Sequence, residues 1–180
     1  MIRLFVGIPI APPVRHLLSI LGASIPGARA VPEDQIHLTL RFIGEVDALT
    51  FGDIKDSLEG LDASSLMLSI QGTGHFPPRG QPRIVWAGID PAGDVIILRN
   101  RVNNRLRLCG IKPEQRKFYP HITLARLKNS PPKRVASFLA ANAQLQSPAF
   151  SVDQVHLYSS ILHPKGALHR VEAVYPLAGP

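Results

Sequence analysis

His37-Leu38-Thr39-Leu40 and His121-Ile122-Thr123-Leu124 are two copies of one short pattern, and they organise the whole sequence. An apolar stripe at helical spacing follows each copy, and it begins 14 residues beyond the histidine, at Phe51 in the first half and at Val135 in the second. Because the offsets agree, we expect two related strand–loop–helix halves within one domain that spans residues 1–180.

The residue order within each copy brings two polar side chains together. Both copies lie in apolar stretches typical of β-strands, where side chains at i and i+2 point to the same face. Each histidine is therefore expected beside its threonine, while Leu38 or Ile122 points the opposite way. Seven His and four Thr in 180 residues would give fewer than one His-x-Thr triplet by composition alone.

Further strands and helices alternate along the chain without a long linker. Apolar alternation predicts strands at residues 2–8, 36–43, 66–71, 83–89, 120–126, 152–158 and 168–174. Apolar stripes predict helices around residues 14–21, 51–61, 95–106 and 135–139. The Gly- and Pro-rich segment 74–80 is either a lid over a substrate or a rigid hairpin turn.

Composition narrows the function classes. The chain has 20 Lys+Arg against 13 Asp+Glu, so its net charge of +7 favours anionic partners, with nucleic acid as the leading class. The single Cys109 cannot form an internal disulfide, and no secretory leader is recognised at the start, so we expect a cytoplasmic protein. The longest apolar runs fall far short of the roughly 20 residues that cross a membrane. We expect a monomer.

Two imidazoles suit a reaction near neutral pH. With an ordinary pKa of about 6.5, one can act as base while the other acts as acid. A phosphodiester needs this division: one histidine deprotonates the attacking water and the other protonates the departing ribose oxygen. The two threonine hydroxyls would donate to the non-bridging phosphate oxygens. No His-x-His, Cys pair or carboxylate cluster lies near either pattern, so we expect no metal and no cofactor.

The remaining candidate features have plainer interpretations. Histidines without a threonine partner are interpreted as structural or solvent-facing, with His75 and His169 the first to reconsider; they are His16, His75, His156, His163 and His169. Trp86 is expected in the core. The arginines of the third helix form either a surface for an RNA backbone or a solvated face; they are Arg99, Arg101, Arg105 and Arg107.

The two His-x-Thr patterns and their flanks resemble the two-histidine phosphoesterases, in particular the RNA 2′,3′-cyclic phosphodiesterase branch, formerly called 2′-5′ RNA ligases. The similar segments cover nearly the whole chain, at residues 2–8, 36–46, 83–89, 118–126 and 155–160. The resemblance implies an α+β fold of two pseudo-symmetric lobes, each an antiparallel sheet flanked by helices, with a central active-site cleft.

The same resemblance implies roles for individual residues. His37 would be the general acid and His121 the general base, while Thr39, Thr123 and Arg126 would bind the phosphate. The implied reaction opens a 2′,3′-cyclic phosphate at an RNA end, such as a tRNA fragment, or in a nucleotide, and leaves a 2′-phosphate.

The sequence departs from the family at two positions where aromatic residues are common. Ala30 and His169 stand there, so base stacking would fall to Phe42, Phe76 or Tyr119, or to Phe118. Three alternative functions remain open. They are a 2′-5′ RNA ligase or phosphodiesterase acting on tRNA halves, an enzyme for small cyclic nucleotides, and a non-catalytic module that binds RNA ends. Intact His and Thr pairs argue against the last.

Overall fold

Both His-x-Thr patterns lie at the beginning of β-strands, as the alternation predicts. The computed structural model describes residues 1–163 and 166–179. Its helices are α1 (Pro12–Ala23), α2 (Ala48–Glu59), α3 (Ala92–Leu108) and α4 (Pro132–Ala141), with a 3₁₀ turn η1 (Glu33–Gln35). The strands of the described residues are β1 (Ile2–Pro9), β2 (Ala28–Ala30), β3 (His37–Val46), β4 (Leu66–Phe76), β5 (Ile84–Asp90), β6 (His121–Leu127), β7 (Phe150–Val152), β8 (Gln154–His163) and β9 (Gly166–Pro176).

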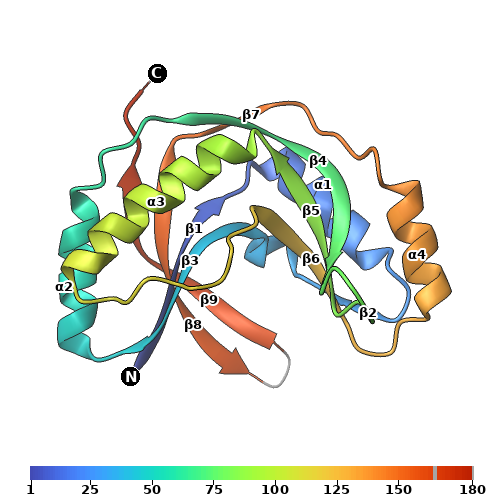
Figure 1. Ribbon diagram of the computed structural model, residues 1–180, viewed down its shortest axis with the longest axis horizontal. Coiled ribbons are helices and arrows are strands. Elements are labelled where there is room, and N and C mark those ends of the chain that lie inside the picture. The colour runs from blue at the N-terminus through green and yellow to red at the C-terminus, as the bar shows by residue number, and fades with distance from the viewer. Residues whose placement is uncertain (164–165, 180) are drawn as a thin grey trace.

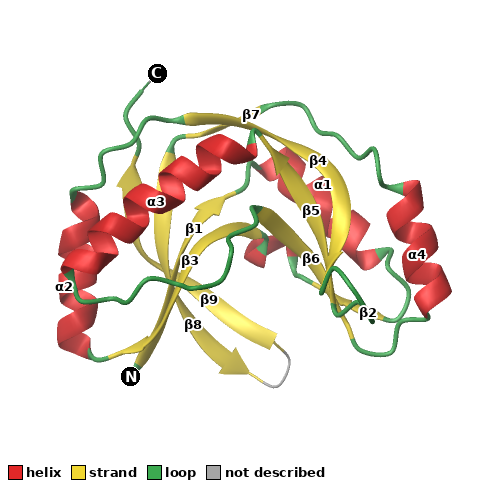
Figure 2. Ribbon diagram, in the orientation of Figure 1, coloured by secondary structure: helices red, strands yellow, loops and turns green. Residues whose placement is uncertain are grey.

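The strands form one curled antiparallel sheet in the order β7-β4-β5-β6-β3-β1-β8-β9. Strand β2 lies outside this order and pairs with β6. Helices α2 and α3 cover one end of the sheet, and α1 and α4 cover the other (Figure 1). Figure 2 shows how the two ends of the sheet curve toward each other. The expected α+β architecture of two antiparallel lobes flanked by helices is therefore confirmed.

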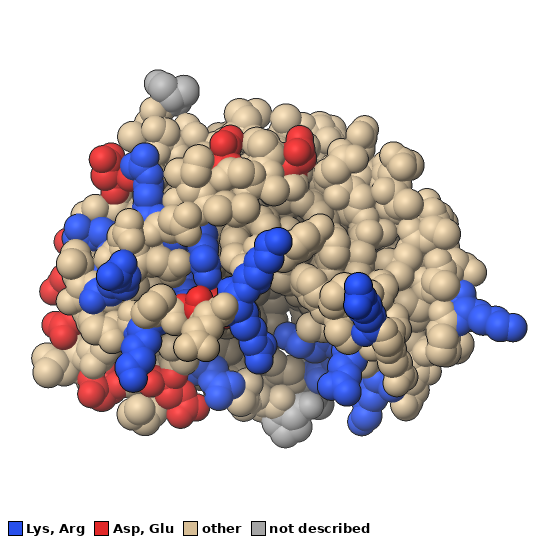
Figure 3. Space-filling view, in the orientation of Figure 1, with Lys and Arg blue, Asp and Glu red and all other residues tan. Residues whose placement is uncertain are grey.

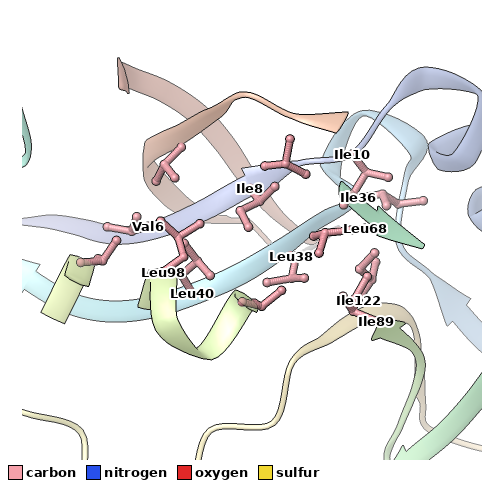
Figure 4. Close-up of a cluster of buried hydrophobic side chains, with 14 of the residues drawn as sticks. Val6, Ile8, Ile10, Ile36, Leu38, Leu40, Leu68, Ile89, Leu98 and Ile122 are labelled. Atoms are coloured by element: carbon pink, nitrogen blue, oxygen red, sulfur yellow. The ribbon is translucent and has the colours of Figure 1, made fainter. Parts of the chain in front are cut away.

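The lobes join where β3 meets β6. The first lobe contains β3, β1, β8 and β9, and the second contains β6, β5, β4 and β7. That junction consists of one antiparallel residue pair, Leu38 opposite Ile122, which are the central residues of the two His-x-Thr patterns. Both side chains are fully buried. Figure 4 shows Leu38 and Ile122 in one apolar cluster with residues of both lobes, such as Ile8 and Ile89. The apolar core therefore fixes the two patterns next to each other through their central residues.

Local signals explain where the helices begin and end. The Asp47 carboxylate accepts a hydrogen bond of 2.7 Å from the Thr50 amide, which caps the start of α2. Proline stands in the first turn of α1 and of α4, where its missing N–H costs nothing. Gly22 allows α1 to lie against β6, since a Cβ there would come within 2.6 Å of the Leu124 carbonyl oxygen.

Strand boundaries differ from the sequence expectation at several places. β4 continues to Phe76, five residues past the expected end, while β2 and β7 were not predicted. Each of these two strands has only three residues, too few to show alternation. Among the described residues, no helix is long and apolar enough to cross a membrane.

Candidate active site

His37 is held by two hydrogen bonds at the first residue of β3. Its Nδ1 lies 2.7 Å from the carbonyl oxygen of Gln35, and its Nε2 lies 3.0 Å from the Thr39 hydroxyl. A carbonyl oxygen can only accept, so Nδ1 carries the hydrogen and donates it. Nε2 is therefore the nitrogen that can take or give a proton, and in the neutral ring it accepts from Thr39.

His121 repeats this arrangement in the second lobe. Its Nδ1 donates to the carbonyl oxygen of Tyr119 at 2.7 Å, again two residues earlier in the chain. Nε2 of His121 is then also free for proton exchange. The orientation follows from the local sequence, because Tyr119 precedes Pro120 and is thereby restricted to an extended backbone.

The antiparallel register brings the two pairs into one group. Because Leu38 lies opposite Ile122, His37 comes across from Thr123, and Thr39 comes across from His121. The four polar side chains share the face opposite to the buried Leu38 and Ile122, and all four are half-buried. The structure thus places two imidazoles and two hydroxyls around one position.

Burial shapes the electrostatics of both histidines. Burial is the main cause that lowers the pKa of His37 to about 4; the backbone hydrogen bond to Gln35 opposes it, and the charges of His169 and His121 add to it. Burial also lowers the pKa of His121, against its bond to Tyr119. Both rings are therefore neutral near pH 7, and a bound anion would favour their protonated forms.

An aromatic group surrounds His37 in the first lobe. Phe5 lies beneath it at 4.8 Å between ring centroids, and Tyr158 lies at 5.6 Å. Phe42, a candidate for base stacking, is 64% exposed, and its ring lies 6.0 Å from Phe5. Phe42 therefore approaches the site at its margin.

A second aromatic group surrounds His121. Phe76 meets the His121 ring edge-on at 4.9 Å, and Tyr119 lies 6.0 Å from Phe76. The structure thus brings these two base-stacking candidates together at the second histidine. The amide of Arg83 donates to the Phe76 carbonyl oxygen at 2.7 Å, so segment 74–80 closes a hairpin. The hairpin interpretation of this segment is favoured over the lid.

The prediction that Trp86 belongs to the core is wrong. The side chain is half-buried, pairs across from Thr123 on β6, and its ring lies 6.3 Å from that of His121 and 5.5 Å from that of Phe76. It covers the backbone of Gly74, where a Cβ would come within 2.2 Å of the indole. Sequence reasoning missed this because a glycine on a neighbouring strand decides where the ring lies.

From the sequence, His169 is interpreted as structural or solvent-facing but is named for reconsideration, and the structure places it beside the site. Its ring lies 5.3 Å from that of His37, at 90°. Arg126, a candidate phosphate ligand, is exposed at the end of β6, and its charge lowers the pKa of His169. By contrast, His16 is a surface residue that contacts Glu33 at 2.9 Å, as its structural interpretation predicts.

Three of the four arginines on α3 contact other parts of the protein, whereas Arg107 is exposed. Arg105 donates from Nε to the Ser57 carbonyl oxygen at 2.6 Å, and Arg101 donates to that of Asp62, so Arg105 binds the C-terminal end of α2 and Arg101 binds the loop that follows it. The Arg99 guanidinium lies 5.0 Å over the ring of Phe118 and thereby covers one face of this candidate for base stacking. The prediction of an RNA surface on α3 is not supported for these residues.

Positive charge instead gathers along the second lobe and the segment that leads into it. Residues 63–89 and 115–152 contain eight Lys and Arg and no Asp or Glu. None of these eight forms an ion pair with another described residue. Figure 3 shows a hollow below the middle of the molecule with Lys and Arg side chains at its edges, while most of the acidic side chains in view lie over the first lobe.

Comparison with known proteins identifies the family. The chain matches the LigT-like phosphoesterase family twice, over residues 8–86 and 89–169, and each match contains one His-x-Thr pattern. It therefore belongs to the LigT-like phosphoesterases, which confirms the resemblance and the internal repeat.

Two relatives are named RNA 2′,3′-cyclic phosphodiesterase. The protein from Archaeoglobus fulgidus is 31% identical over 93% of this chain and 96% of its own length. The protein from Aeropyrum pernix is 31% identical over 84% of this chain and 87% of its own. Among solved structures, TT0787 of Thermus thermophilus has a TM-score of 0.79 at 28% identity, covering 98% of both chains. E. coli LigT complexed with 3′-AMP shares the fold, with a TM-score of 0.77 at 24% identity and 98% coverage of both chains.

Proposed function

We propose that this protein opens the 2′,3′-cyclic phosphate at an RNA end and leaves a 2′-phosphate, with His37 and His121 as its proton-transfer pair. The observation that carries the proposal is the Leu38–Ile122 register, which gathers both His-Thr pairs on one face. The names of the relatives support the substrate class.

The proton transfers use the Nε2 atom of each histidine, because each Nδ1 is held by a backbone carbonyl oxygen. His121 Nε2 takes a proton from water as the water oxygen forms a bond to phosphorus. The bond between phosphorus and the ribose 3′-oxygen breaks, and His37 Nε2 supplies a proton to that oxygen. Each such transfer typically contributes about 10²–10⁴-fold to the rate. The assignment of acid and base follows the family resemblance.

His37 must be protonated to act as the acid, although its pKa is about 4 in the free protein. A cyclic phosphate carries a negative charge, and an anion beside the imidazole raises the pKa of the ring. Substrate binding thus favours the protonated form of His37, which is the form that acts as the general acid. Once Nε2 carries a hydrogen, the Thr39 hydroxyl no longer donates to it and is free to donate to the phosphate.

Charge on the phosphate grows as water attacks, and hydrogen-bond donors that are already in position stabilise it. Thr39 and Thr123 would donate to the non-bridging oxygens. Arg126, whose charge already acts on His169, would add a positive charge beside them. Side chains supply every step of this mechanism, so it requires no metal.

The experiment uses an RNA with a 2′,3′-cyclic phosphate end, incubated with the protein with and without EDTA. We expect a 2′-phosphate product and equal rates in the two reactions. A 3′-phosphate product would mean that the roles of the two histidines or the ribose pose are wrong. Metal-dependent recovery after chelation would contradict the metal-free mechanism, and joined RNA ends would point to ligation.

A further inference from the structure

A third histidine stands beside His37, outside both His-x-Thr patterns. His169 lies on β9 opposite Ser160 of β8. Its ring is perpendicular to that of His37, with centroids 5.3 Å apart, and meets Phe5 edge-on at 4.9 Å. The hairpin of β8 and β9 therefore delivers a further imidazole to the face that carries the proposed proton-transfer pair.

The surroundings of the ring decide which nitrogen carries the hydrogen. Nδ1 of His169 is buried and has no hydrogen-bond partner among the described residues. A buried N–H without an acceptor is rare in proteins, whereas an unpaired acceptor is tolerated more often. The lone pair therefore belongs on Nδ1 and the hydrogen on Nε2, which makes Nε2–H the donor of this ring.

Charged and titratable groups face His169 from three elements: His37 on β3, Asp34 in η1 and Arg126 on β6. Burial lowers the pKa of His169, the charge of Arg126 lowers it further, and Asp34 opposes both. The ring is consequently neutral near pH 7. In this neutral form the ring can donate a hydrogen bond from Nε2–H to a bound anion.

We propose that His169 is a further phosphate-binding residue, which donates a hydrogen bond from Nε2 to a non-bridging oxygen of the cyclic phosphate. The inference rests on the proposed function, because the phosphate must lie at His37 for His169 to reach it. The residue binds and positions the phosphate; it exchanges no proton with the substrate.

Two substitutions separate this role from a purely structural one. His169→Phe keeps a ring for packing against Phe5 but removes the donor, whereas His169→Gln removes the ring and keeps an N–H near the position of Nε2. His16→Gln serves as the control, because His16 is an exposed histidine bound to Glu33. Isothermal titration measures the Kd for inorganic phosphate and, separately, for adenosine.

We expect His169→Phe to weaken phosphate binding about 10- to 100-fold, the usual loss for a hydrogen bond to a charged group. His169→Gln should stay within about threefold of the wild type, and adenosine binding should weaken in neither variant. In hydrolysis, KM should rise in His169→Phe and much less in His169→Gln.

The opposite order, with Phe equal to the wild type and Gln impaired, would overturn the proposal in favour of ring packing. Equal phosphate affinity in all variants, equal losses in both, or a loss confined to adenosine would overturn it as well. If circular dichroism shows that the Phe variant is unfolded, His169→Ala is tested with added imidazole, which must restore phosphate binding. Phosphate binding needs no turnover, so a wild type that fails to hydrolyse cyclic phosphate refutes the proposed function separately.

Discussion

Leu38 and Ile122 form the one residue pair that joins β3 to β6, and each lies between the histidine and the threonine of its own pattern. Both side chains are fully buried. The polar side chains on the opposite face are consequently fixed in relation to each other by an apolar contact. In this protein, the packing of the core and the spacing of the proposed catalytic groups depend on the same two residues.

Truncating either member of this pair should therefore affect stability and activity together. Leu38→Ala should lower the free energy of unfolding by about 2–5 kcal/mol, the usual range for a buried leucine, and should also lower kcat. Leu58→Ala, at an equally buried position in the last turn of α2, is the matched control. It should cost similar stability but leave kcat close to the wild type. Urea unfolding measures the stability of each variant, and initial rates measure kcat. Equal kcat in Leu38→Ala and Leu58→Ala would contradict the link between the packing of this pair and the spacing of the proposed catalytic groups.

The activity should favour acidic pH in the free enzyme. The mechanism needs one protonated and one neutral histidine, and burial lowers the pKa of His37 to about 4 and also lowers that of His121. The kcat/KM profile, which reports the free enzyme, should thus have its maximum below pH 6.5. The kcat profile should lie at higher pH, because the bound phosphate raises both pKa values. Coincident profiles centred above pH 7 would be inconsistent with these shifts.

Gly74 should be essential for the position of Trp86. In Gly74→Ala, the new methyl group would meet the indole at 2.2 Å and force it away from His121. Because Trp86 is the only tryptophan, the emission maximum of intrinsic fluorescence reports its movement directly. We expect a shifted emission maximum and a lower kcat/KM. Gly52→Ala in α2, where a Cβ meets nothing within 4 Å, should change neither.

The basic second lobe should matter for long RNA more than for a nucleotide. Binding through phosphates releases counterions, so kcat/KM for an RNA of some 20 nucleotides should fall as salt increases. The double variant Arg83→Ala/Lys128→Ala should reduce that salt dependence. The kcat/KM for a 2′,3′-cyclic mononucleotide should change little, both with added salt and in the double variant. Lys55→Ala, on α2 of the first lobe, is the control. Equal losses for both substrates would place these cations in a structural role.

The sequence predicts the parts of the site that depend on local geometry. Strand alternation alone sets each histidine beside its threonine, and the repeated pattern indicates that two such pairs belong together. The place of Trp86 is not predicted, and His169 is singled out only for reconsideration, because neither position follows from its own neighbours. Trp86 depends on a glycine of β4, and His169 depends on how the hairpin of β8 and β9 crosses the first lobe.

The arginines of α3 also show that spacing in the sequence does not predict tertiary contacts. Their i, i+4 spacing predicts a shared face for Arg101 and Arg105 but says nothing about what that face meets. In the fold it meets carbonyl oxygens at the end of α2 and in the loop that follows. Charge in a sequence therefore predicts a partner only when the tertiary structure leaves that charge unpaired.

The most direct test of the central claim is the single-turnover rate at which His37→Ala and His121→Ala hydrolyse an RNA with a 2′,3′-cyclic phosphate end. Both variants should remain folded and should still bind a 2′-nucleotide, because each keeps both threonines and the Leu38–Ile122 pair. Each should lose at least about 10²-fold in rate, with no recovery on adding metal ions. An unchanged rate in either variant would contradict the two-histidine mechanism.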